Sequence, residues 1–189
     1  LPARAEMCIR DSLEALRVLG EAGWVPESDV ELHWYSAEEG GLLGSRAVAA
    51  EYERKHRRVQ AMLQMDMTAF VKDGTQERIG VVTDYVSPAL TDFVERLVGA
   101  YLRLPVVRSV MHYGASDHAS WSAAGYPSAF AMEAYVCSSS RPVLLKTATC
   151  NVSMYVLMDS PTRPRVMCRK HPSSRSHTCS SSCACLCRL

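Results

Sequence analysis

Residues 61–66 form the segment that most restricts how this chain can fold. Ala61-Met-Leu-Gln-Met-Asp66 is almost continuously apolar until the acid at its end. Such a run is typical of a strand covered on both faces in a parallel or mixed sheet, where helices usually provide the cover. The chain is therefore predicted to contain a helix-covered sheet with a carboxylate at the end of one strand.

Strand and helix patterns alternate along the chain on both sides of this segment. Further strands are predicted at 30–35, 79–83, 106–110 and 128–133, and helices at 13–19, at 45–56, from Ser87-Pro88 to Tyr101, and from Ser116 or Asp117. The buried face of the helix that ends at Tyr101 is predicted to comprise Leu90, Phe93, Val94, Leu97, Val98 and Tyr101. Strands that alternate with helices predict an α/β sandwich.

Charge and cysteine content divide the chain near residue 136. Residues 1–136 hold 13 basic and 19 acidic side chains, whereas 137–189 hold 8 and 1, so the total of +1 conceals a change from −6 to +7. Seven of the eight cysteines follow residue 136. Apart from an isolated strand pattern at 152–158, no period persists there. Residues 137–189 are therefore predicted to be a disordered low-complexity tail outside the domain.

Two functional roles compete with low complexity as explanations of this tail. The Ser-Ser-Cys-Ala-Cys-Leu-Cys stretch offers thiolates for a metal, although its spacing matches no standard zinc module. The +7 balance suits nucleic acid, but no aromatic interleaving or known module accompanies it, so no nucleic-acid partner is predicted. No run of eighteen apolar residues occurs in the sequence, and no membrane partner is predicted.

Three acids fall where strands are predicted to end. Glu38 and Glu39 follow the strand at 30–35 within a glycine-rich turn, and Asp66 closes the apolar strand. Open α/β sheets bind ligands beyond the carboxyl ends of their strands, and carboxylates suit zinc when they are combined with imidazole. From composition alone, an acidic loop and a strand-end cap explain these three residues better.

Three ordered motifs reverse that judgement, because together they resemble one enzyme family. The motifs are Tyr35-Ser-Ala-Glu-Glu-Gly-Gly-Leu-Leu-Gly-Ser45, Leu63-Gln-Met-Asp-Met-Thr68 and Ser116-Asp-His-Ala-Ser-Trp121, the last followed by Gly125-Tyr-Pro127. In order and spacing, from about residue 13 to 134, they resemble the secreted leucine aminopeptidases of the co-catalytic two-zinc exopeptidase family. The resemblance implies a three-layer α/β sandwich with a mostly parallel mixed sheet flanked by helices.

The resemblance also implies a role for each acid. Glu38 matches the family's general base, Glu39 a ligand of one zinc, and Asp66 a ligand of the other. Tyr113 matches the tyrosine beside the substrate carbonyl, a hydrogen-bond donor to the oxyanion. The implied reaction removes the N-terminal residue of a peptide or protein: two zinc ions share a water, Glu38 takes its proton, and the hydroxide attacks the carbonyl.

An apolar pocket for the first substrate side chain is implied as well. The positions that match its lining are Met67, Val82, Phe130 and Met132. Unaided, the pattern predicts core residues at all four. Asp117 and His118 match a motif that mainly shapes the site, so neither is predicted to be a ligand. His33, inside a predicted strand, is interpreted as a packed residue.

The chain departs from the family pattern at both ends. The family's His-x-Asp motif and bridging aspartate precede the helix at 13–19, and an Ile-His-Thr motif follows the strand at 128–133. Neither is found here, and Asp11 lies too close to that helix to bridge two ions. At least three of five metal ligands are therefore missing. The chain is interpreted as a truncated or mis-joined copy that is itself inactive.

This interpretation divides the chain into an unmatched start at 1–12, a partial catalytic domain at 13–136 and the tail at 137–189. Limited proteolysis is expected to trim the chain to about residue 136. The family implies a secreted, monomeric protein. The alternative is a non-catalytic homologue that serves as a protein-interaction scaffold, and retention of the three acids argues against it.

Overall fold

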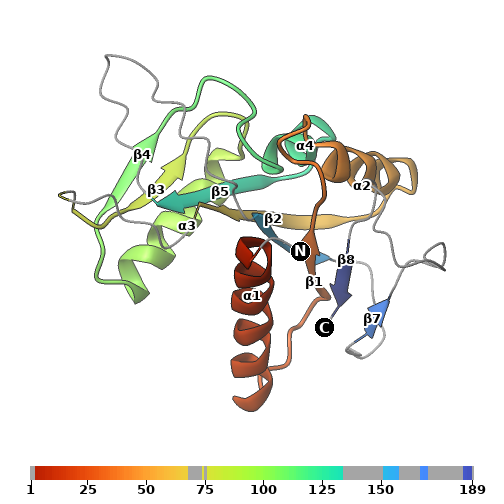
Figure 1. Ribbon diagram of the computed structural model, residues 1–189, viewed down its shortest axis with the longest axis horizontal. Coiled ribbons are helices and arrows are strands. Elements are labelled where there is room, and N and C mark those ends of the chain that lie inside the picture. Colours follow the sequence, from red (N-terminus) through yellow and green to blue (C-terminus); the bar gives the residue numbers. More distant parts are fainter. Residues whose placement is uncertain are drawn as a thin grey trace.

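The computed structural model describes residues 3–67, 74, 76–133, 151–157, 167–169 and 185–188. In chain order the elements are α1 (Ala3–Glu21), β1 (Val30–Trp34), α2 (Leu43–Arg54), β2 (Val59–Asp66), β3 (Ile79–Val82), α3 (Pro88–Tyr101), β4 (Val106–Ser109), α4 (His118–Ala123), β5 (Ser128–Glu133), β6 (Asn151–Leu157), β7 (Met167–Arg169) and β8 (Cys185–Arg188). Helices α2 and α4 lie on one side of a mixed sheet, and α1 and α3 on the other (Figure 1). The predicted α/β class with a helix-flanked mixed sheet is confirmed.

The described strands form one sheet in the order β4-β3-β5-β2-β6-β1-β8-β7. The pairs β2–β5 and β3–β4 are parallel and the other five are antiparallel. More pairs are antiparallel than predicted, because β6 separates β1 from β2 and β3 runs opposite to β5. Strands β1, β2 and β5 nevertheless share one direction, so their carboxyl ends lie at the same edge of the sheet.

Three of these strands come from the segment predicted to be a disordered tail. Strand β6 pairs with β1 on one side and with β2 on the other, and β8 pairs with β1 and β7. The structure differs here from the prediction, because main-chain pairing with a neighbouring strand does not require a periodic sequence. The remainder of 137–189 lies outside the described residues. The boundary at 136 stays a prediction. Limited proteolysis tests it, because β6 is hydrogen-bonded to a strand on each side and should resist cleavage if it belongs to the domain.

Helix α1 begins before the predicted start of the domain. It runs without a break from Ala3 to Glu21, across the boundary placed at residues 12 and 13. The predicted end is confirmed, because Gly23 adopts a left-handed conformation with φ 69° and its N–H donates to the carbonyl of Gly20 at 3.0 Å. A left-handed glycine just beyond the last turn is a common helix stop.

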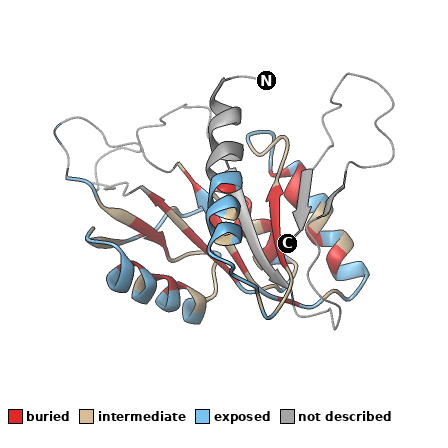
Figure 2. Ribbon diagram, turned by 90° about the horizontal axis from the view of Figure 1, so that it is seen from below, coloured by how far each residue is buried: buried red, intermediate tan, exposed pale blue. Residues whose placement is uncertain are grey.

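Helix α3 buries less of its apolar surface than predicted. Thr91, Val94 and Val98 are buried, which gives a narrow stripe at helical spacing. Three other residues of the predicted buried face are exposed by 39–80%: Phe93, Leu97 and Tyr101. The outer side of α3 is accordingly coloured as exposed in Figure 2. The apolar pattern is wider than the part of the helix that the sheet covers.

Two clusters of buried apolar residues lie on this framework. One joins α2, β2 and α4 and contains Ala49, Tyr52, Val59, Met62 and Trp121. The other joins β3 and β5 and contains Val82, Phe130 and Met132. Within the described ranges, no helix is both long and apolar enough to cross a membrane.

Candidate active site at the carboxyl edge of the sheet

A tight loop, residues 36–42, joins β1 to α2 and carries the predicted base and one predicted ligand. The N–H groups of Gly41 and Leu42 both donate to the carbonyl oxygen of Glu38, at 3.0 and 2.9 Å. Glu38 is partly buried and Glu39 is exposed. The loop therefore presents two adjacent carboxylates at the edge where β1 and β2 end.

Left-handed backbone gathers around the predicted site. Among the described residues other than glycine, six have positive φ, and four of these lie within three residues of a predicted base, ligand or oxyanion donor. The four are Ala37 (φ 56°), Leu42 (φ 61°), Met67 (φ 51°) and His112 (φ 66°). Each such residue costs on the order of 1–3 kcal/mol and persists only where its surroundings fix it, a pattern typical of functional sites.

The close approach of α2 to the loop predicts a strong effect at one glycine. A Cβ added at Gly44 would lie 2.7 Å from the carbonyl oxygen and 2.9 Å from the nitrogen of Ser36. Because both atoms are backbone, Gly44→Ala is expected to lower the free energy of unfolding by about 1–3 kcal/mol, measured by urea denaturation. Gly99→Ala on α3, where nothing lies within 4 Å, is the control and should be neutral or stabilising. Equal stability of the two variants would contradict this geometry.

Asp66 ends β2 in a buried position with 3% of its surface exposed. Its Oδ2 accepts a hydrogen bond from Ser116 Oγ at 2.8 Å. Burial raises the pKa of Asp66 to about 7; bonds from Ser116 and the Met67 backbone lower it, and the charges of Asp117 and Glu39 raise it further. Glu39 and Asp66 thus lie within reach of each other's charge. A carboxylate disfavoured in this way is one that a bound cation stabilises.

The donor set is suited to zinc but incomplete. Glu39 and Asp66 supply oxygen ligands of the kind that bind zinc together with imidazole. Within the described part of the chain, no group of three or more His, Cys, Asp or Glu side chains is placed to hold a metal ion. The described residues therefore provide part of a metal site, and a complete site needs further donors.

His118 is a buried, neutral member of this region. Its ring stacks against Phe130 with centroids 4.7 Å apart and planes at 31°. Neither ring nitrogen finds a hydrogen-bond partner of normal geometry among the described residues. Burial lowers the pKa of His118 to about 4, which the charge and backbone of Asp84 only partly offset. The imidazole is uncharged at neutral pH, and its flat face packs against the cluster of Val82, Phe130 and Met132 through Phe130.

The predicted pocket residues lie together. Phe130, Met132 and Val82 are at most 2% exposed and form one cluster, against which Met67 packs. Met67 follows the predicted ligand Asp66 directly, so the cluster adjoins the carboxylates. In the structure these side chains are held as packed core.

Two residues of this region were missed by sequence analysis. Asp84 accepts hydrogen bonds from the N–H groups of Met111 and His112, at 3.0 and 2.7 Å, and so holds the loop that carries Tyr113. Tyr113 itself is 60% exposed. Ser116 holds Asp66 as described above. Asp84 could have been found from the sequence, because it is an acid just after a predicted strand. No sequence pattern pairs Ser116 with Asp66, fifty positions earlier.

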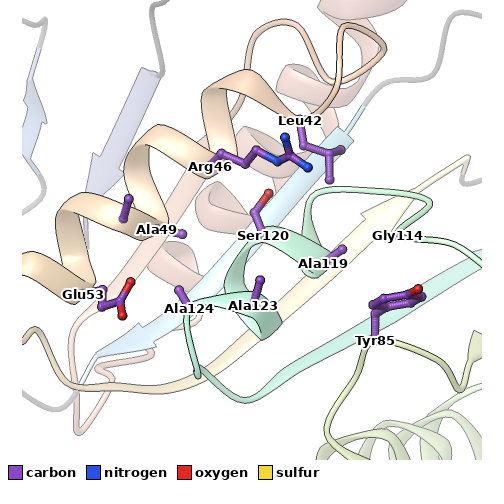
Figure 3. Close-up of a pocket in the computed structure, with 11 residues that line it drawn as sticks. Leu42, Arg46, Ala49, Glu53, Tyr85, Gly114, Ala119, Ser120, Ala123 and Ala124 are labelled. Atoms are coloured by element: carbon purple, nitrogen blue, oxygen red, sulfur yellow. The ribbon is translucent and has the colours of Figure 1, made fainter.

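A groove of about 440 Å³ lies between α2 and α4. Arg46 and Glu53 of α2 face the small residues Ala119, Ser120 and Ala123 of α4 across it (Figure 3). The residues that line it include none of the predicted site residues. The groove adjoins the candidate site, because Leu42 of the 36–42 loop and Gly114, next to Tyr113, are among its lining residues.

One family model, described as Peptidase family M28, matches residues 7–163. This chain belongs to Peptidase family M28. The match to this family of peptide hydrolases extends beyond the predicted domain of 13–136 in both directions and includes β6.

Relatives of this M28 chain are leucine aminopeptidases. It is 50% identical over 133 residues to leucine aminopeptidase 1 of Pyrenophora tritici-repentis, and 50% identical over 129 residues to that of Neurospora crassa. These matches cover 64% of the chain and 33% and 32% of the relatives. The crystal structure of Legionella pneumophila LapA aminopeptidase matches with a TM-score of 0.51 and 39% identity, over 53% of this chain and 27% of LapA. The chain thus spans about a third of the length of these curated relatives.

Proposed function

We propose that this M28 chain derives from a zinc-dependent aminopeptidase that removes N-terminal, preferably apolar, residues from peptides and proteins outside the cell. One observation carries the proposal: the loop with Glu38 and Glu39 lies at the same sheet edge as the buried Asp66, close enough for Glu39 and Asp66 to interact. The names of the relatives support the same activity. We further propose that the protein is a secreted monomer.

In this proposal each acid has one task. Glu39 and Asp66 would each hold one of two zinc ions, with further ligands supplied from elsewhere. When bound, the ions would polarise the scissile carbonyl and lower the pKa of a water molecule. Glu38 would accept a proton from the attacking water and pass it to the leaving amine. The Tyr113 hydroxyl would donate a hydrogen bond to the developing oxyanion.

The preference for apolar N-terminal residues would come from the cluster beside the carboxylates. Met67 adjoins Asp66 in sequence, and Phe130 and Met132 pack with it. Side chains of this kind reward the burial of an apolar substrate side chain and penalise that of a charged one. A comparison of leucyl and lysyl anilides would measure this preference in an active form.

The 189-residue chain itself is expected to release no product from leucyl p-nitroanilide, even with added zinc. Each ion would keep one family ligand in this sequence, either Glu39 or Asp66, whereas zinc in enzymes normally has three or more. A form extended with the family's His-x-Asp and Ile-His-Thr segments is the positive control. Zinc-dependent turnover by the 189-residue chain would contradict the expectation, and an inactive extended form that binds two zinc ions would contradict the proposed function.

A further inference from the structure

The loop at 36–42 has a conformation that its own residues do not favour. Ala37 and Leu42 both adopt left-handed backbone, at φ 56° and 61°, and both carry a side chain. Such residues keep this conformation only where neighbouring contacts impose it. Backbone hydrogen bonds within the loop, such as those from Gly41 and Leu42 to Glu38, supply some of these contacts. Contacts from the rest of the fold to its two ends supply others.

Two side-chain hydrogen bonds join the two ends of the loop to α4. Just before the loop, the Tyr35 hydroxyl accepts a bond from Trp121 Nε1 at 2.9 Å, and it also lies 2.9 Å from His33 Nδ1. Just after the loop, Ser45 Oγ lies 2.8 Å from Ser120 Oγ. Trp121 and Ser45 are fully buried and Tyr35 is half-buried, so both bonds are shielded from water at least on one side.

The same short segment of chain also reaches the predicted ligand on the other strand. Ser116, two residues before α4, donates its hydrogen bond to Asp66. Backbone hydrogen bonds join Ser116 to the first turn of α4: the N–H groups of Ala119 and Ser120 donate to the carbonyls of Ser116 and Asp117, both at 3.1 Å. Residues 116–121 therefore touch Asp66 at one end and the two anchors of the loop at the other.

We propose that residues 116–121 act as a spacer that fixes the 36–42 loop relative to Asp66. Tyr35, Ser45 and Ser120 are then positioning residues: they contact no reacting atom but set where the two predicted zinc ligands stand. The restraint of the loop by residues 116–121 can be tested in this chain alone. Its meaning for catalysis rests on the proposed aminopeptidase function.

Hydrogen exchange of the full 189-residue chain tests the spacer directly. Tyr35→Phe and Ser120→Ala each remove one hydroxyl anchor of the loop. Both are expected to speed exchange of the amides of residues 41–44 by about five- to tenfold, the size expected for one lost buried hydrogen bond. Exchange in α3 and β3 should stay unchanged. Unchanged rates at 41–44, or a uniform rise throughout the chain, would overturn the proposal.

Tyr126→Phe is the matched control. Tyr126 packs on the same Trp121 ring, with centroids 5.4 Å apart, and its hydroxyl donates to the carbonyl of Arg57 at 3.0 Å. The Tyr126→Phe variant therefore loses an equivalent hydrogen bond in the same cluster and changes no contact at either end of the loop. Rates at 41–44 should match the unmodified chain. An equal rise in this variant would show general loosening of the core and would overturn the proposal.

Ser116→Ala tests transmission through the segment. This change removes the bond to Asp66 and makes no direct change at the loop. If residues 116–121 move as one unit, amides 41–44 should still exchange several-fold faster than in the unmodified chain. No change there would overturn the spacer. That result would leave the aminopeptidase proposal standing, because activity of the extended form tests it separately.

Discussion

Glu38→Gln, in a form extended with the family's missing ligand segments, is expected to lower kcat by about 10²–10⁴-fold while both zinc ions stay bound. The amide keeps the shape of the side chain but cannot accept a proton, and a positioned general base contributes a factor of this size. Turnover of leucyl p-nitroanilide and zinc content by elemental analysis measure the two effects separately.

Glu39→Ala is the matched variant, one residue along the same loop. It should lose zinc as well as turnover, because Glu39 is assigned as a ligand and Glu38 is not. Equal zinc loss in the two variants would show that the base and the ligand have been interchanged. Loss of zinc in Glu38→Gln alone would assign the ligand role to Glu38.

Glu31→Ala is expected to destabilise the fold by about 3–5 kcal/mol, because it removes the centre of a buried polar network. Glu31 is fully buried in β1; its Oε2 lies 3.0 Å from His33 Nε2 and accepts a bond from the Tyr52 hydroxyl, and its Oε1 lies 3.9 Å from Arg57 Nη2. The change leaves His33 and Tyr52 in the core without this acceptor. Chemical denaturation monitored by tryptophan fluorescence measures the loss.

An exposed glutamate provides the comparison for this variant. Glu51 on α2 pairs with Arg54 and Lys55, both at 2.7 Å, but these pairs are open to solvent. Glu51→Ala should therefore change the stability little. Similar losses of stability in Glu31→Ala and Glu51→Ala would contradict the claim that the buried network stabilises the fold more than the exposed pairs do.

The sequence predicted the elements well where the apolar residues form a clear pattern, either a period or an unbroken run. Strand β5 begins and ends at the predicted residues 128 and 133, and β2 ends at Asp66 as expected. Period alone does not say how much of an apolar face a neighbour will cover, so Phe93, Leu97 and Tyr101 of α3 were wrongly predicted to be buried. Strand β6 has contacts with β1 and β2 that lie far away in sequence, and local patterns carry no such information.

The acids of the candidate site were proposed from the sequence and stay a prediction, whereas the residues that hold them were not foreseen. From composition alone, an acidic loop and a strand-end cap explain Glu39 and Asp66 better than a metal site does, and only the resemblance to a family favours the metal site. His33 was correctly interpreted as packed. The hydrogen bond from Ser116 to Asp66 depends on where β2 and α4 meet, which is a property of the folded chain.

The exposed side of α3 also determines how this chain must be handled in solution. Phe93, Leu97 and Tyr101 recur every four residues, so these exposed apolar side chains lie in one row along the helix. Kosmotropic salts strengthen the association of such surfaces, whereas chaotropic ions weaken it. Precipitation with ammonium sulfate will therefore remove this chain from solution early, and buffers low in sulfate and phosphate suit its purification.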